Sequence, residues 1–390
     1  MRILHFATSR TGGAGLAAAS LNDALIEFGI TSNIISRKLH DVSISKSKYF
    51  RNFRSSATTF FQSSLVQKTD DLVTPISYGF IRNIDRVIES HDIFHFHSFY
   101  NLMNFEQISS IVKTGKPIFI TLHDQRFFTG GCHCSRECHR YEKDCKSCPQ
   151  VRILTQNLVA RSFKKLRSAI GKNNVHFIAP SNWMANLVSK SPIAEGLAVS
   201  TISNIVNIFP KNRNSQVKDN QIKKFVFVSS NINDSYKGFR VLNRALELID
   251  RKVLEKIEFT FVGKGNLPGL SPNLKINHKK FLSQYELSEE YCEADALVLP
   301  STQDNLPNVM IEALLYGLPI IGSSVGGITE TLKKFNLPLC ESGNASDLAK
   351  QLTLFDPGNY DSEEISRQAK RLFSRDSITR EHIELYRNAL

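Results

Sequence analysis

Two carboxylates, Asp304 and Glu312, stand eight residues apart in a stretch whose pattern predicts a strand over 296–300 and a helix over 307–316. Parallel sheets bind ligands at the carboxyl ends of their strands, so both side chains are expected near such an edge. Carboxylates accept hydrogen bonds from sugar or ribose hydroxyls, and the start of a helix favours phosphate. The pair therefore indicates a site for a compound that carries both. The alternative is that both carboxylates only cap and solvate the helix.

A second candidate site is a cysteine cluster, because five of the seven cysteines lie within 17 residues. Cys145 and Cys148 have the spacing of a metal knuckle, and two further thiols would complete a tetrahedral structural zinc site with no open position for catalysis. The candidate ligands are Cys132, Cys138, Cys145 and Cys148, with Cys134, His133 and His139 as spares. Free or redox-sensitive thiols are the next alternative, and disulfides are disfavoured where thiols stay reduced. The other two cysteines, Cys292 and Cys340, are expected to be buried.

The elements that must position these residues alternate between strand and helix. An apolar strand at 3–7, a glycine-rich turn at 9–15 and a helix at 16–28 form the opening of a Rossmann-like unit. Further strands are predicted at 93–96, 118–122, 175–179, 199–203, 224–229, 257–262, 296–300 and 319–322, and helices at 239–248, 285–293 and 307–316. This alternation predicts an α/β protein whose parallel sheets carry helices on both faces.

Two such series meet near residues 204–222, where the chain is polar. The sequence therefore predicts two doubly wound, Rossmann-like domains, at 1–205 and 206–372. The first domain would contain the Cys-rich insert at 130–150. A helix at 373–390 is expected to pack back on the first domain.

The composition is that of a globular protein, with 41% hydrophobic and 22% charged residues in a chain of 390. Such values exclude disordered and fibrous proteins. No run of about 18 apolar residues occurs, so no membrane-spanning helix is predicted. The first residues lack the apolar segment of a signal peptide and instead predict a strand. We therefore expect a cytoplasmic protein.

The net charge of +12 is unevenly distributed, because residues 1–200 carry 25 Lys and Arg against 14 Asp and Glu. Basic residues gather in two stretches, 37–54, which precedes Phe60 and Phe61, and 152–172, which has apolar residues at helical spacing. A basic amphipathic helix can lie on an anionic membrane surface. The alternative is a solvated helix that packs its apolar face on its own domain. Nucleic acid is not expected as a partner, because no motif for binding it is present.

The stretch 300–322, followed by Val-Gly-Gly-Ile-Thr-Glu at 325–330, resembles the E-x7-E signature of the family 4 retaining glycosyltransferases, which have the GT-B fold. Asp304 stands where the first Glu of that signature is usual. The Asn-Leu-Pro-Asn run at 305–308 and the Glu-Ala-Leu run that begins at Glu312 are typical of bacterial polysaccharide members.

Other segments resemble motifs of the same family in the same order along the chain. They are the glycine turn 12–15, the histidine motif 121–124, the segments 180–183 and 204–207, the Lys-Gly motif 236–239, the turn 261–265 and the segment 279–281 before the expected base-binding region. Two departures concern charge and turn chemistry. Asn231 stands where the family commonly has an Arg, and the Gly and Asp of the family's turn are replaced in 204–207.

The resemblance implies a role for each matched residue in a cleft between the domains. Glu312 would hold the ribose hydroxyls and Asp304 the hydroxyls of the donor sugar, while Lys237 would stabilise the departing diphosphate. His123 would position the transferred sugar. The implied donor-binding residues are Gly12, Gly13, Gly15, Asn231, Gly263, Asn305, Leu306, Pro307 and Asn308. No catalytic metal is implied.

The expected activity is retaining transfer of a sugar from a nucleoside diphosphate donor, UDP being favoured over GDP, to a growing glycan. A polyprenyl diphosphate-linked acceptor at the inner membrane surface would suit the basic first domain. Two alternatives keep the same fold: a sugar-nucleotide enzyme of the epimerase type, and a catalytically silent binding partner. Donor turnover with and without a glycan acceptor separates the three.

Overall fold

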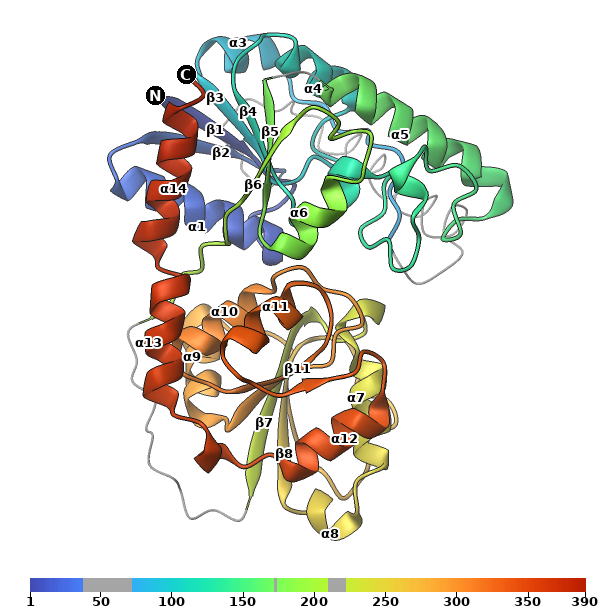
Figure 1. Cartoon of the computed structure of the whole chain (residues 1–390), viewed down its shortest axis with the longest axis vertical. Coiled ribbons are helices and arrows are strands. Elements are labelled where there is room, and N and C mark those ends of the chain that lie inside the picture. The colour runs from blue at the N-terminus through green and yellow to red at the C-terminus, as the bar shows by residue number, and fades with distance from the viewer. Residues whose placement is uncertain (38–71, 172–173, 210–221) are drawn as a thin grey trace. The chain divides into compact units, whose positions relative to one another are not determined.

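The computed structural model describes residues 1–37, 72–171, 174–209 and 222–390. These residues form two compact units (Figure 1). Unit 1 comprises Met1–Ile205 with Asp376–Leu390, and unit 2 comprises Val206–Arg375. The polar linker at 210–221 and almost all of the basic stretch 37–54, with the two phenylalanines after it, lie outside the described residues.

Within its described residues, unit 1 forms a parallel sheet of six strands in the order β2-β1-β3-β4-β5-β6. The strands are β1 (Arg2–Phe6), β2 (Thr31–Ile35), β3 (Ile93–Phe96), β4 (Ile118–Thr121), β5 (Val175–Ala179) and β6 (Ala198–Thr201). The helices are α1 (Gly13–Glu27), α3 (Ile84–Glu89), α4 (Phe105–Val112), α5 (Gln156–Ile170), α6 (Asn182–Val188) and α14 (Arg375–Arg387), with 3-10 turns at Arg126–Phe128, Arg140–Glu142 and Ile153–Thr155. This order makes β1, β3 and β4 neighbours.

The two faces of this sheet are covered by different helices. Alternate side chains of a strand point to opposite faces, and Leu4 and Phe6 of β1 pack in a core shared with α4, α5 and α6. Ile3 of the same strand packs with α1 and α14 instead. His5 alternates with Leu4 and Phe6, so it faces α1 and α14, and His95 is its register partner on β3.

Unit 2 forms a second parallel sheet, in the order β12-β11-β10-β7-β8-β9. The strands are β7 (Lys223–Asn231), β8 (Ile257–Lys264), β9 (Lys275–Lys279), β10 (Ala296–Leu299), β11 (Ile320–Ser323) and β12 (Leu339–Cys340). The helices are α7 (Phe239–Glu247), α8 (Arg251–Leu254), α9 (Gln284–Glu293), α10 (Asn308–Leu315), α11 (Gly326–Lys334), α12 (Ala345–Leu354) and α13 (Ser362–Leu372), with 3-10 turns at Ser235–Lys237 and Pro357–Asn359. One apolar core lies on each face. Two parallel sheets with helices on both faces confirm the predicted doubly wound architecture.

Three strands escaped the sequence prediction, and each of them lies at the edge of its sheet. Of the five residues of β9 none is buried, β2 buries two of its five, and β12 has only two residues. An edge strand has a neighbour on one side only and buries fewer side chains, so it carries a weaker apolar pattern.

The basic helix predicted after residue 152 is α5, and it packs its apolar face inside unit 1. Phe163 and Leu166 are buried in the core that α5 shares with the sheet. Leu154, one of the apolar residues at helical spacing in 152–172, does not join this face: it lies in the 3-10 turn before the helix and is 93% exposed. No described helix is long and apolar enough to cross a membrane. Cys340 is buried as expected, whereas Cys292 is only half-buried.

Candidate functional site

The first pair of site residues that the structure brings together is Lys237 and Asp304. The 3-10 turn that ends at Lys237 is followed by Gly238, whose φ is 78°. A Cβ on Gly238 would lie 1.8 Å from the carbonyl oxygen of Pro300, so only glycine lets this turn close on the end of β10. The backbone N–H of Thr302 donates to the carbonyl of Tyr236 across the same contact, at 2.8 Å.

The result is an ion pair in which Lys237 Nζ donates to Asp304 Oδ2 at 2.7 Å. Asp304 also accepts hydrogen bonds from the Ser301 hydroxyl at 3.3 Å and from the Asn305 backbone N–H at 3.1 Å. The side chains of Lys237 and Asp304 are 21% and 13% exposed. A ligand can therefore reach both charges, and the ammonium can exchange its carboxylate partner for a phosphate.

Glu312 does not join this pair, although the sequence placed it near Asp304. It lies on α10, is 5% exposed, and accepts a hydrogen bond from the Tyr291 hydroxyl at 2.9 Å. Burial raises the pKa of Glu312 to about 7, and the hydrogen bonds from Tyr291 and Gln284 hold it from rising further. A carboxyl group in this state can accept or donate hydrogen bonds near neutral pH.

Tyr291 and Gln284 were missed by sequence reasoning. Both lie on α9, seven residues apart, which is close to two helical turns, so they share one face of the helix. That spacing is the available signal. It could not by itself show that the face meets a carboxylate on a different helix.

The last residues of β7 and β8 include two further predicted site residues, Asn231 and Gly263. Gly263 has a φ of 141°, and a Cβ there would lie 1.9 Å from the Ser229 carbonyl oxygen, so the two strand ends touch. Asn231, the residue in place of the family's Arg, donates from Nδ2 to Asp234 Oδ1 at 2.9 Å and accepts from the Asn233 N–H. Its amide organises its own loop and brings no positive charge.

The run 305–308 leads into α10. Asn305 and Leu306 are buried, Pro307 is the N-cap, and Asn308 is the first helical residue. No side chain caps this helix and no acidic residue lies in its first turn. Its N-terminal amides therefore leave a partial positive charge for an anionic group.

The glycine turn of unit 1 has the same property at the start of α1. Gly12 has a φ of 79° and is the N-cap, with neither a side-chain cap nor an acidic residue in the first turn of the helix. A Cβ at Gly15 would lie 2.2 Å from the Ser9 carbonyl oxygen, so close packing requires that glycine. Gly12 and Gly13 face open space, which would let a phosphate approach the backbone amides.

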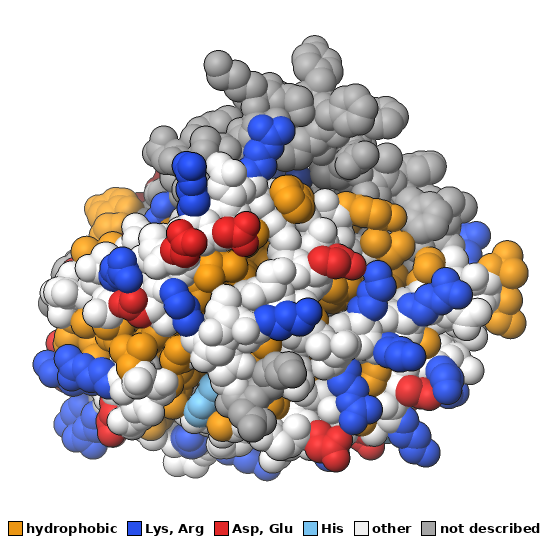
Figure 2. All heavy atoms as spheres, turned by 90° about the horizontal axis from the view of Figure 1, so that it is seen from above, with side chains coloured by type: hydrophobic (Ala, Val, Ile, Leu, Met, Phe, Trp, Pro, Cys, Tyr) orange, Lys and Arg blue, Asp and Glu red, His pale blue; other side chains and the backbone are white. Residues whose placement is uncertain are grey.

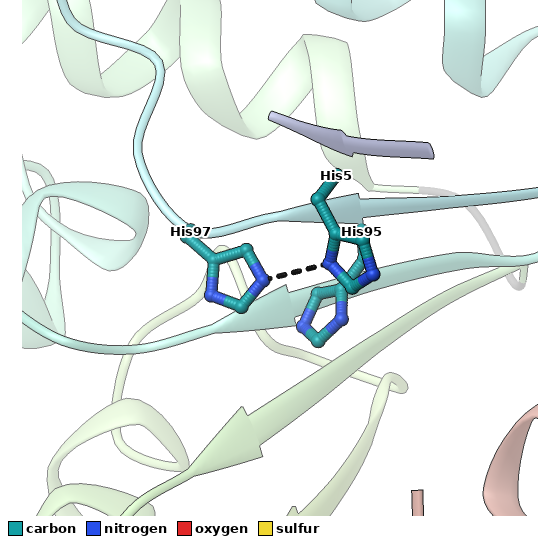
Figure 3. Close-up of side chains that lie close together, drawn as sticks. All are labelled: His5, His95 and His97. Atoms are coloured by element: carbon teal, nitrogen blue, oxygen red, sulfur yellow. Dashed lines mark hydrogen bonds between the residues drawn. The ribbon is translucent and has the colours of Figure 1, made fainter. Parts of the chain in front are cut away.

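His123 follows β4, is half-buried, and lies beside three buried histidines, His5, His95 and His97, which Figure 3 shows. Its Nε2 lies 3.0 Å from His97 Nδ1, and His97 Nε2 lies 3.0 Å from His5 Nδ1. Potential ligand atoms of His5, His95 and His97 all lie within 4.8 Å of one another. Sequence reasoning found only His123. The signal for His95 and His97 is the His-Phe-His alternation at 95–97, whereas His5 on β1 stands in no such pattern.

Burial keeps these imidazoles neutral. It lowers the pKa of His5 to about 3 and that of His123 to about 4, and it lowers the pKa of His95 and His97 well below the ordinary value. His95 is tied separately, with Nδ1 2.7 Å from the Tyr386 hydroxyl of α14 and Nε2 2.7 Å from the Thr121 hydroxyl. At neutral pH, His123 can therefore orient a ligand by a hydrogen bond and not by charge.

The four predicted metal ligands line one cavity of the insert. Its lining is Cys132, Cys138, Cys145 and Cys148, with Thr129, Ser135, Arg140 and Tyr141. All seven cysteines are free thiols, and three of these four are buried, Cys138 being the exception. Backbone N–H groups point at the sulfurs: Gly130 donates to Cys145 Sγ at 3.2 Å, and Cys148 accepts from two backbone amides.

The spare candidates are less suited to this cavity. His139 is exposed and its Nδ1 lies 3.0 Å from Glu142 Oε1. His133 Nδ1 instead lies 3.5 Å from Asp124 Oδ2. Cys134 is not among the residues that line the cavity.

The two units have the GT-B fold, and the whole chain aligns with solved structures of that fold. Sucrose-phosphate synthase of Thermosynechococcus elongatus aligns over 100% of this chain and 98% of its own, with a TM-score of 0.65 and 15% identity. HepE of Anabaena, solved in complex with UDP-glucose, aligns over 100% of both chains with a TM-score of 0.61 and 14% identity.

Residues 222–355 match the family described as glycosyl transferases group 1. A protein of Escherichia coli K12 named as a colanic acid biosynthesis glycosyl transferase, WcaC, is 26% identical over 262 residues. That match covers 62% of this chain and 62% of WcaC, which is less than two thirds of each. These findings confirm the predicted GT-B fold and the resemblance to glycosyltransferases.

Proposed function

We propose that this protein is a retaining, family 4-like glycosyltransferase that moves a sugar from a nucleoside diphosphate to a glycan in surface polysaccharide synthesis. The observation that carries the proposal is the reachable Lys237–Asp304 pair at the carboxyl end of the unit 2 sheet. It lies in the segment that matches the group 1 family. The name of WcaC supports a polysaccharide product, and the ligand of HepE supports a UDP-sugar over a GDP-sugar.

A cation near the diphosphate would stabilise the transition state, because negative charge develops there as the glycosidic bond breaks. Lys237 is held by Asp304 until a donor arrives. When Lys237 turns to the diphosphate, the Asp304 carboxylate becomes free to accept hydrogen bonds from hydroxyls of the donor sugar. Glu312 would accept hydrogen bonds from the ribose hydroxyls, and the backbone amides at Gly12 would bind phosphate. His123 would orient the transferred sugar.

The test is saturation-transfer NMR with a panel of UDP- and GDP-sugars, followed by donor turnover with and without glycan acceptors. Lys237→Ala and Glu312→Ala should each lower transfer by about 100-fold or more while the protein stays folded. Lys252→Ala, which removes an exposed lysine of α8, should leave transfer unchanged. Normal turnover in both site variants would refute the assignment.

The same assay separates the two alternatives. Donor consumption that needs no acceptor would indicate an epimerase-like enzyme. No binding of any donor to folded protein would indicate a silent partner.

We propose that the acceptor is lipid-linked and that unit 1 meets an anionic membrane surface at the start of α5. Ile153 and Leu154 are 79% and 93% exposed there, beside the exposed Arg152. Lys and Arg side chains are also spread among apolar ones over the face of the molecule in Figure 2. Leu154→Ser should weaken co-sedimentation with anionic vesicles, whereas Leu354→Ser, at an exposed leucine of α12, should not. Equal binding of both variants would overturn the proposal.

We further propose a structural zinc ion in the cavity of the insert, held by Cys132, Cys138, Cys145 and Cys148. Four thiolates are a complete tetrahedral set for zinc, and N–H groups aimed at the sulfurs stabilise their charge, as the outer partners of metal ligands do. The insert 130–150 has a single three-residue 3-10 turn as its regular structure. A metal ion would therefore stabilise the fold of the insert, which has almost no helix or strand to do so.

Metal analysis of protein purified without chelator should find one zinc per chain. Cys148→Ser should lose the metal and lower the melting temperature, whereas Cys134→Ser should keep both at the wild-type level. Wild-type protein that contains no zinc and melts at the same temperature with or without added metal would contradict the proposal.

A further inference from the structure

Three histidines from neighbouring strands form a continuous line of ring-to-ring hydrogen bonds. His5 of β1 meets His97 at the end of β3, and His97 meets His123 after β4, each contact measuring 3.0 Å between ring nitrogens. Figure 3 shows the first of these contacts beside His95. We call the line His5–His97–His123 the histidine relay.

Each contact in the relay joins the Nδ1 of one ring to the Nε2 of the next. A neutral imidazole carries one proton, on one of its two nitrogens. Since one proton lies in each contact, both contacts must point the same way along the relay. Two arrangements are therefore possible: every ring is protonated at Nδ1, or every ring is protonated at Nε2.

The inner end of the relay decides between them. His5 is fully buried, and its Nε2 has no hydrogen-bond partner among the residues that the structure describes. If the protons were on Nε2, His5 would bury an unpaired N–H donor. If they are on Nδ1, His5 buries an unpaired acceptor instead. Unpaired donors are the rarer of the two in protein interiors, so protonation at Nδ1 is favoured.

We infer that the relay holds His123 as the tautomer protonated at Nδ1. His5 donates from Nδ1 to His97, His97 donates from Nδ1 to Nε2 of His123, and the N–H of His123 lies on the ring nitrogen outside the relay. His5 and His97 are then positioning residues. If the proposed function holds, the Nδ1–H of His123 is the donor that faces the transferred sugar. Its partner on the sugar is then an oxygen that accepts a hydrogen bond.

His95 lies against the relay without belonging to it. Its ring centroid is 4.2 Å from that of His97 and 5.1 Å from that of His5, but both of its nitrogens are already in hydrogen bonds to Tyr386 and Thr121. A metal ion bound by His5, His95 and His97 would have to displace these bonds. Such an ion would appear in metal analysis of the Cys148→Ser variant and would overturn the relay.

The tautomer can be read without any substrate by NMR of the whole protein labelled with ¹⁵N-histidine, with His123→Gln to assign the signal. We expect the proton of His123 on Nδ1. His97→Phe keeps an aromatic ring but removes both contacts. Nε2 of His123 then loses its donor, and the tautomer of His123 protonated at Nε2 should become populated. In His176→Phe, a histidine of β5 bonded to Ser200, the signal of His123 should not change.

A proton on Nε2 of His123 in the wild-type protein, or a tautomer that stays unchanged in His97→Phe, would overturn the inference. If His97→Phe fails to fold, His97→Gln retains an amide donor at the same position and should keep the Nδ1 tautomer in part. Given a transferase assay, His97→Phe should lower kcat/KM by about 10- to 100-fold. The NMR result stands whether or not the proposed activity is found.

Discussion

Burial of the Glu312 carboxylate, which the proposed function uses to bind the donor, should lower the stability of the folded protein. Its pKa is about 7 in the folded protein against about 4.3 in an unfolded chain. Between these values the folded state holds the proton that the unfolded state has lost, so stability falls as the pH rises through this window.

Glu312→Gln should therefore stabilise unit 2 by about 2–3 kcal/mol at pH 8, and change its stability little near pH 4, while donor binding is lost. Urea unfolding followed by circular dichroism at both pH values measures the difference. Tyr291→Phe is the matched variant, because it removes the hydroxyl that donates to the ionised carboxylate and should lower stability at pH 8. A Glu312→Gln variant less stable than wild type at pH 8 would disprove the argument.

The motifs found Lys237, Asp304 and Glu312 from the chain alone, because each lies in a local pattern of glycine, proline and apolar residues. His5 and His97 could not be found that way. Their contact depends on β1 and β3 being adjacent in the sheet, although they are separated by more than 90 residues of sequence.

Among the connecting elements, the turn at Gly238 places Lys237 within reach of Asp304. Gly238→Ala would place a Cβ 1.8 Å from the Pro300 carbonyl oxygen, at a φ of 78°. Gly343→Ala has nearly the same φ, 74°, with nothing within 4 Å. Gly343→Ala, the control, should lower the stability by about 1 kcal/mol, because alanine disfavours a left-handed backbone. Gly238→Ala should lower it several times more and also weaken donor binding. Equal losses of stability in both variants would show that the close contact is not needed.

The central strands were predictable because each is a short run of buried apolar residues, and the helices because their apolar positions recur on one side. Of the four edge strands only β6 was predicted, and β2, β9 and β12 were missed; β9, for example, presents no buried side chain. The insert was predictable as a cysteine cluster, but its backbone path was not, because its three non-glycine residues at positive φ, Arg136, Cys145 and Ser147, follow no pattern of period two or 3.6.

Over the whole molecule, the two units should respond to pH in opposite directions. Unit 1 buries neutral histidines, with the pKa of His5 lowered to about 3 and those of His123 and His382 to about 4. Unfolding lets them bind protons below about pH 6.5, so stability falls as the pH drops through that value. Each should cost about 2 kcal/mol at pH 5.

The single tryptophan, Trp183, lies on α6 in unit 1 and reports that unit alone. Its fluorescence transition in urea should move to clearly lower urea at pH 5 than at pH 7.5. Circular dichroism reports both units, so the part of its transition that the fluorescence does not follow belongs to unit 2. That part should not move to lower urea, because the raised pKa of Glu312 makes unit 2 more stable at pH 5 than at pH 7.5. Parallel shifts of both transitions would contradict this account.

The hydrogen bond between His95 and Tyr386 joins residues 291 positions apart. Its consequence concerns synthesis on the ribosome: the core of unit 1 receives its last helix, α14, only after all of unit 2 has been made. Unit 2 is one continuous segment and can fold as soon as it emerges, while the sheet face that holds Ile3, Ile93 and Phe119 still lacks α14. Chaperones that bind nascent chains should therefore protect the β1–β3–β4 face longest, and a stalled chain ending before residue 375 should stay sensitive to protease in its first half.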